Sequence, residues 1–204
     1  MNNITYGFQC RGIVVKRFFP HSSKLHIFDE EQGLISLHLS DVTLLHRLWP
    51  GMHVAYSYLE KKGNKYISLI DILLVPISSS YQMLQKLQRL IKVCNVCLQK
   101  NIPHKKNYSL LLIGLHSFVE DIVLFGDIEL WISALILQDA GYWNKDLFLV
   151  INKFLMKLSV LIDSFIQHEV ELFQEWLSVI NRNYAEVLEM WIETCLNEQV
   201  YYEK

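Results

Sequence analysis

The sequence predicts an α+β protein in which an N-terminal five-stranded β-barrel is followed by an all-helical domain. Between residues 12 and 75, short apolar segments alternate with turn residues at the spacing of strands. From Tyr81 onward, apolar residues recur at intervals of three and four, which is the period of an α-helix. The segment 76–80, rich in serine, separates the two patterns. We therefore expect two domains, residues 1–77 and 78–204.

Five strands are expected in the first domain. They span residues 12–18, 24–28, 34–39, 52–59 and 65–70, and a helical or irregular link at 40–49 joins the third to the fourth. Gly63 and Asn64 are expected to supply the positive φ angles of the tight hairpin between the last two strands. This order of strands is that of an OB-fold, a small barrel that commonly binds oligonucleotides or oligosaccharides.

The second domain contains five helical segments. They are expected at residues 81–100, 107–119, 127–141, 145–165 and 167–196, with Gly126 and Asp127 separating the second from the third. Residues 110–119 carry no charge, so this helix is expected at the centre of the helical core. Trp176 and Trp191 fall close to the same helix face, where core packing is favoured over docking of a partner.

Composition favours a soluble cytoplasmic protein. Hydrophobic residues make up 51% of the 204 residues, enough for a sizeable core with some apolar surface left for a partner. No uncharged apolar run reaches the ~18 residues of a membrane helix, and no signal peptide is evident. Residues 1–120 hold 14 basic and 7 acidic residues, whereas residues 121–204 hold 5 and 14. The two ends of the molecule are expected to face different partners or each other.

Neither an enzyme nor a metal protein is predicted. The chain has no Gly-rich phosphate loop and no nucleophile motif. Cys94 and Cys97 share one face of a helix, but no second pair of ligands follows, so we expect them in the core rather than at a metal. Cys10 and Cys195 are isolated, and five histidines are scattered singly through the barrel: His21, His26, His38, His46 and His53. We expect no catalytic residue and no cofactor.

Basic and aromatic residues of the barrel predict binding of single-stranded nucleic acid. OB-folds combine a basic groove with aromatic platforms, because each nucleotide carries a charge and each base a flat face. The candidate binding residues flank the first link, the link at 40–49 and the last hairpin; they are Lys16, Arg17, Lys24, Arg47, Lys61, Lys62 and Lys65. The interleaved aromatics are Phe18, Phe19, Tyr56, Tyr58 and Tyr66. The other interpretation is that these lysines only solvate turns while half of the aromatics fill the barrel.

Two segments resemble the bacterial DNA-repair protein RecO, a recombination mediator whose N-terminal domain is an OB-fold. The first is Gly12-Ile-Val-Val-Lys-Arg with Ser23-Lys-Leu-His-Ile-Phe-Asp-Glu-Glu-Gln-Gly-Leu-Ile-Ser-Leu, and the second is Asp127-Ile-Glu-Leu-Trp-Ile-Ser-Ala-Leu-Ile-Leu-Gln-Asp-Ala-Gly-Tyr142. With the helices between them, they cover about the first three quarters of the chain.

The resemblance implies a non-enzymatic role in DNA repair and recombination. A RecO-like mediator binds and anneals single-stranded DNA and helps to replace single-strand-binding protein by the RecA recombinase, with RecR as partner. The chain departs from the family at two places: residues 40–43 replace a basic loop, and residues 143–152 lack four zinc-binding cysteines. The alternative is therefore an OB-fold protein-interaction adaptor that has lost DNA binding.

Overall fold

The N-terminal part of the chain forms a closed five-stranded barrel, as predicted. The computed structural model describes residues 10–18, 20–78, 80–120, 122–142, 144–163 and 167–202. The strands are β1 (Cys10–Arg17), β2 (Lys24–Asp29), β3 (Gly33–Leu39), β4 (His53–Lys61) and β5 (Asn64–Leu74), and the short 3-10 helix η1 (Val42–His46) joins β3 to β4. Their order around the barrel is β1-β2-β3-β5-β4, with β3 and β5 parallel and the other pairs antiparallel. This is the OB-fold arrangement.

The interior of the barrel follows from the alternation of side chains along each strand. Leu25 and Ile27 of β2 and Ile35 and Leu37 of β3 are almost completely buried and belong to one apolar cluster inside the barrel. Residues two apart on a strand point to the same face, so the residues between them point outward. The outward face therefore carries the residues that can contact helices or ligands.

The hairpin between β4 and β5 turns one residue earlier than predicted. The two positive φ angles belong to Lys62 (51°) and Gly63 (77°), and Asn64 already pairs with Lys61 in the ladder. Two successive positive φ angles are typical of the type I′ turns that match the twist of a hairpin. β5 also continues four residues beyond its predicted end, to Leu74.

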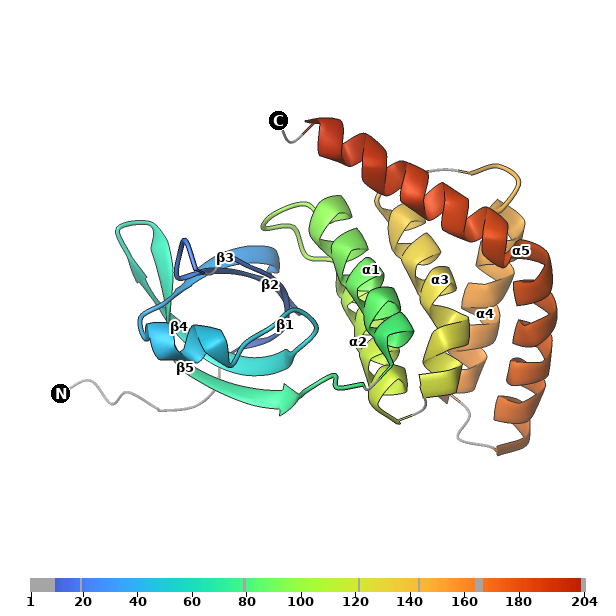
Figure 1. Ribbon diagram of the computed structural model, residues 1–204, viewed down its shortest axis with the longest axis horizontal. Coiled ribbons are helices and arrows are strands. Elements are labelled where there is room, and N and C mark those ends of the chain that lie inside the picture. The colour runs from blue at the N-terminus through green and yellow to red at the C-terminus, as the bar shows by residue number, and fades with distance from the viewer. Residues whose placement is uncertain are drawn as a thin grey trace.

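The helical part contains five helices, as expected from the periodicity. They are α1 (Tyr81–Cys97), α2 (Lys105–Glu120), α3 (Ile122–Asp139), α4 (Phe148–Asp163) and α5 (Gln167–Tyr202). Ser80 caps α1, because its Oγ accepts a hydrogen bond from the backbone N–H of Met83. Figure 1 shows α1 and α2 beside the barrel, while α5 runs near α4 and continues across the ends of the other helices.

The helix at the centre of this core is α3, not α2, which contains the uncharged stretch 110–119. Every side chain from Ile128 to Leu137 is buried, and α3 packs against the other four helices. Gly126 lies inside α3 rather than in a break before it, so this prediction was wrong. A Cβ at Gly126 would lie 3.1 Å from Cε of Met83, so the glycine allows α1 to approach. Helix period alone cannot separate a packing glycine from a helix end.

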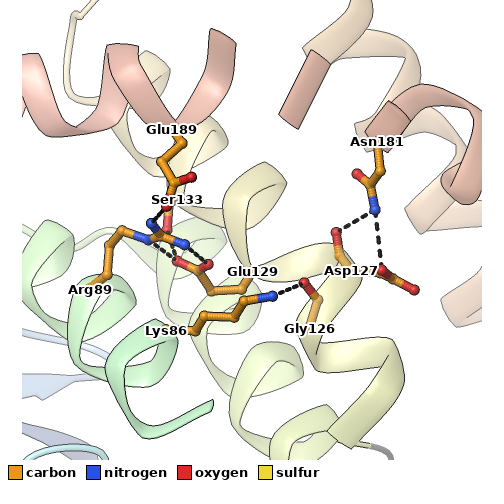
Figure 2. A network of polar contacts seen from close by, with 8 residues as sticks. All are labelled: Lys86, Arg89, Gly126, Asp127, Glu129, Ser133, Asn181 and Glu189. Carbon is orange, nitrogen blue, oxygen red and sulfur yellow. Dashed lines mark hydrogen bonds and ion pairs between the residues drawn. The ribbon is translucent and has the colours of Figure 1, made fainter. Parts of the chain in front are cut away.

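A network of polar contacts, buried at Glu129 and exposed at Glu189, joins three helices (Figure 2). Arg89 of α1 makes two hydrogen bonds to the carboxylate of Glu129 in α3, at 3.0 and 2.7 Å, and a further ion pair to Glu189 of α5. The Glu129 side chain is 0% exposed, and burial raises the pKa of its carboxyl while the Arg89 guanidinium lowers it. The network therefore favours one relative position of α1, α3 and α5, because the buried Glu129 carboxylate is stable only with the Arg89 guanidinium beside it.

The cysteines and tryptophans expected in the core of the helical part lie there. Cys94 is fully buried, and Cys97 and Cys195 pack in the same cluster. Burial raises the pKa of Cys97 to about 12 and that of Cys195 to about 11, so both thiols stay protonated at neutral pH. Trp176 and Trp191 are half-buried and pack against this core, as expected.

The barrel and the helices share a continuous apolar contact. Ile13, Phe28 and Leu34 point out of the barrel and belong to the same buried cluster as the helices. The ring of Phe28 packs edge-on against that of Tyr108 in α2, with centroids 5.6 Å apart. One half of the outward face of β1–β3 is thus covered by helices, which leaves the other half as the surface on which a site can form.

Candidate nucleic-acid interface

The rest of the outward face is built from two rows of paired residues, and His26 in the first row is itself buried against Phe18 and Asn95 of α1. In the first row, Lys16 of β1 pairs with His26 of β2, and His26 pairs with Ser36 of β3. In the next row, Lys24 pairs with His38, which pairs with Tyr66 of β5. Side chains of paired residues lie side by side on the same face of a sheet. The register therefore gathers residues from four strands on one surface.

A groove opens on this surface where β5 turns away from β3. The two strands pair only at Leu39 and His38, and the gap beyond these residues has a volume of about 300 Å³. Its lining residues are Lys24, Leu34, Ile35, Ser36, His38, Gly63, Asn64, Lys65, Lys100 and Asn101. Three of the described lining residues are lysines, and none is acidic. The groove is therefore suited to an anionic ligand.

Phe18 connects the groove to the end of β1. The ammonium group of Lys24 lies 5.3 Å from the centre of the Phe18 ring, and that of Lys16 lies 5.1 Å from it. His26 packs edge-on against the same ring at 4.9 Å. Two cations beside one half-buried aromatic ring provide both of the features with which OB-folds hold a single strand.

Lys100 belongs to the site, although no motif in the sequence predicts it. It lies in the link between α1 and α2, where it forms a bridge with Leu34, and the N–H of Asn101 donates to the Leu34 carbonyl at 3.0 Å. The link thereby covers the part of the β3 edge that β5 leaves open. No local signal places residue 100 beside residue 34, because the contact depends on how α1 packs on the barrel.

The pKa of His26 is lowered by burial and, to a smaller extent, by the positive charge gathered here. The imidazole is 7% exposed, and its pKa is lowered first by burial and then by Lys100, Lys24 and Lys16. Its Nδ1 lies 3.3 Å from Oδ1 of Asn95 in α1, and this contact partly offsets the lowering. Three lysines from β1, β2 and the α1–α2 link therefore act on one point of the surface.

The remaining candidate residues do not all converge on the groove. The Lys65 ammonium lines it but is held by Oε1 of Gln32 at 2.7 Å and lies 4.9 Å from the centre of the Tyr58 ring. Lys61 and Lys62 are exposed beside the hairpin turn and are not among the residues that line the groove.

Two arginines lie at another part of the barrel. Arg17 donates to the Leu48 carbonyl at 3.3 Å, and Arg47 follows η1 and lines a separate hollow beside β5. Among the predicted aromatics, Tyr56 is buried in the barrel and Phe19 lies outside the described residues. The predicted basic residues are therefore divided among three regions: the groove with the adjoining Phe18 ring, the β4–β5 turn, and the part of the barrel near Leu48.

Acid should weaken the contact between barrel and helices. His53 of β4 is 8% exposed, lies 3.0 Å from the hydroxyl of Tyr108, and has its pKa lowered by burial to about 4. Because the folded pKa is below the ordinary 6.5, the unfolded chain binds protons that the folded chain excludes. Stability is therefore complete above pH ~6.5 and is lost as pH falls toward 4, by about 2 kcal/mol at pH ~4.5 for His53.

The difference between wild type and His53→Gln isolates this effect. Urea unfolding at a series of pH values should show a shallower loss below pH ~6.5 in the variant, because glutamine keeps an acceptor for Tyr108 but does not titrate. His21→Gln is the matched control, since His21 is exposed. If the unfolding free energy of the wild type and that of His53→Gln fall equally below pH ~6.5, a neutral imidazole is not buried at this contact.

Comparisons with protein-family models and with curated proteins found no match. Within the described residues, no helix is both long enough and apolar enough to cross a lipid bilayer. The same residues contain no group of three or more His, Cys, Asp or Glu side chains placed to hold a metal ion.

Proposed function

We propose that this protein is a RecO-like recombination mediator in DNA repair that binds single-stranded DNA in the groove between β3 and β5. Lys24, Lys65 and Lys100 would neutralise phosphates, while bases stack on Phe18. Binding would combine electrostatic attraction with stacking and would involve no covalent chemistry.

The observation that carries this proposal is the convergence of three lysines in a groove whose described lining has no acidic residue. The groove lies on the β2–β3 face beside the β4–β5 hairpin, and the β1–β2 link at Phe18 lies next to it. OB-folds bind oligonucleotides on this face, between these same two loops. Lys100 supplies a positive charge that residues 40–43, which stand in place of a basic loop, do not.

The recombination role rests on the resemblance of two segments to RecO. The first segment contains β1, β2 and much of β3, and it carries Lys16 and Lys24 of the proposed interface. The second lies in α3 and at its end, where its side chains are mostly buried, so it supports the fold rather than a binding role. On the basis of this resemblance, we include in the proposal the annealing of complementary strands and assistance to RecA loading. The proposed partners are RecR-like and single-strand-binding proteins.

Removing the three groove lysines should weaken DNA binding and reduce its salt dependence. For Lys24→Ala/Lys65→Ala/Lys100→Ala, the slope of log affinity against log salt should become flatter by about 2 units, at ~0.7 per phosphate contact. Titration of a labelled oligothymidylate at several salt concentrations, followed by fluorescence anisotropy, measures both quantities.

The charge-matched control is Lys145→Ala/Lys153→Ala/Arg182→Ala, which removes three exposed cations outside the barrel. It should bind as the wild type does, since these residues lie on α4, on α5 and before α4. Equal losses in the two triple variants would assign binding to net charge instead of the groove. Absence of binding by the wild type at low salt would favour the adaptor.

A further inference from the structure

A second basic hollow lies between the barrel and α1. Its walls come from the end of β1, the segment before β4, the segment between β5 and α1, and one side of α1. Its volume is about 750 Å³, within the ~300–1,000 Å³ typical of ligand pockets. Val15, Leu87 and Ile91 give it apolar walls. We call this hollow the β1–α1 cleft.

The charges that line the β1–α1 cleft are all positive. Lys16, Arg17 and Lys92 are among its lining residues, and no described lining residue is acidic. Arg17 is fixed by its hydrogen bond to the Leu48 carbonyl, and Lys92 is exposed on α1. A hollow with apolar walls and only cationic charge favours a ligand that is both aromatic and anionic.

Trp49 stands in this cleft on a rigid support. Trp49 as a whole is 44% exposed, and its backbone carbonyl accepts a hydrogen bond from the Met52 N–H at 3.2 Å. Pro50 and Gly51, with φ of 96°, occupy the central positions, as in a type II turn. Gly51 N–H donates to the Val14 carbonyl at 2.7 Å, which ties the turn to β1. Because these bonds fix the backbone that carries it, the exposed indole can stack on a base with less loss of entropy than a residue on a flexible loop.

The cleft and the groove are connected through Phe18. Lys16 lines the cleft, and Lys24 lines the groove. Their ammonium groups lie 5.1 and 5.3 Å from the centre of the same Phe18 ring. A strand that leaves the groove past Phe18 therefore meets Lys16 and then the cleft, with no described acidic lining residue in either hollow.

We propose that the β1–α1 cleft binds the continuation of the single strand held in the groove, with a base stacked on Trp49 and phosphates beside Lys16 and Lys92. This inference rests on the proposed function. The competing occupant is an acidic peptide with apolar side chains. The continuity with the groove and the exposed indole favour the nucleic acid, because a flat ring matches a base and the charges continue along one path.

The test compares two lengths of oligothymidylate on the cleft variant Trp49→Ala/Lys92→Ala. An oligonucleotide of about 5 nucleotides fills the groove alone, and one of about 15 nucleotides can reach the cleft, given site sizes of ~4–16 nucleotides per OB-fold. The variant should bind the long oligonucleotide about tenfold more weakly and the short one as the wild type does. Leu149→Ala/Lys145→Ala, also an exposed apolar residue with a lysine, is the matched control.

The outcomes separate the cleft from the groove. Unchanged affinity of the cleft variant for both lengths, or the same loss on both, overturns the cleft as the path of the strand. The cleft is assigned to peptides by a different pair of results. A synthetic acidic peptide with apolar side chains then binds the wild type but not the cleft variant, and the long oligonucleotide binds both proteins equally. If the wild type binds neither oligonucleotide, the proposed function fails together with this inference.

Discussion

Replacing Gly33 by alanine is expected to destabilise the protein by about 3 kcal/mol and to weaken binding of single-stranded DNA. Gly33 begins β3 with φ of 74°, a conformation that L-residues rarely adopt. A Cβ at this position would overlap the backbone carbonyl of Ile102 in the α1–α2 link, with the carbonyl carbon only 2.6 Å away. Because both partners are backbone, the link must move, and Lys100 moves with it.

Gly63→Ala is a close control for this change. Gly63 has φ of 77°, almost the same as Gly33, but no atom lies within 4 Å of its would-be Cβ. Gly63→Ala should therefore lower the unfolding free energy only by the backbone strain of the positive φ, about 1 kcal/mol. Urea unfolding measures both free energies. Anisotropy titration measures the effect of Gly33→Ala on binding, whereas Gly63 lines the groove, so Gly63→Ala is a control for stability alone. Similar costs for the two variants would show that the link does not pack on β3 as described.

Replacing Arg89 by methionine is expected to cost about 3–5 kcal/mol of unfolding free energy. The substitution leaves the carboxylate of Glu129 buried without its two charged hydrogen bonds. Among the described residues, the Ser133 hydroxyl still donates to it, at 3.3 Å. A buried carboxylate without its cation is far less stable than a protonated one, so the pKa of Glu129 should rise further. The stability of Arg89→Met should then increase as pH falls through that raised pKa.

Two further variants separate the buried pair from the exposed one. Glu189→Gln removes the partner whose side chain is 55% exposed and should change stability by less than ~1 kcal/mol. Arg89→Met/Glu129→Met removes both buried charges and should recover most of the loss, since apolar replacements of buried pairs are often neutral. A double variant as unstable as Arg89→Met would contradict the assignment of the loss to an unpaired carboxylate. Guanidinium unfolding at several pH values provides these comparisons.

The alternation of residues in the strands determined much of the barrel. In Lys24-Leu-His-Ile-Phe-Asp29, Leu25 and Ile27 were identifiable as one face, and the structure places them inside. The same segment also contains Phe28 on the outward face, at the end where the helices pack. An apolar residue on that face indicates a covering element, although it does not say which one. The helical period after Tyr81 and the Ser80 cap likewise depend on neighbours in sequence, so they were accessible without the structure.

Tertiary structure alone decided which half of the outward face became a site. The helices cover Phe28 and Leu34 and leave Lys24 and His38 open, and this division depends on where α1 and α2 pack. Lys100 reaches the groove only because the α1–α2 link pairs with Leu34. The partner of Glu129 lies forty residues earlier in the chain, at Arg89. Periodicity reports on neighbours three or four residues apart, whereas these contacts join distant segments, so only the folded chain could bring them together.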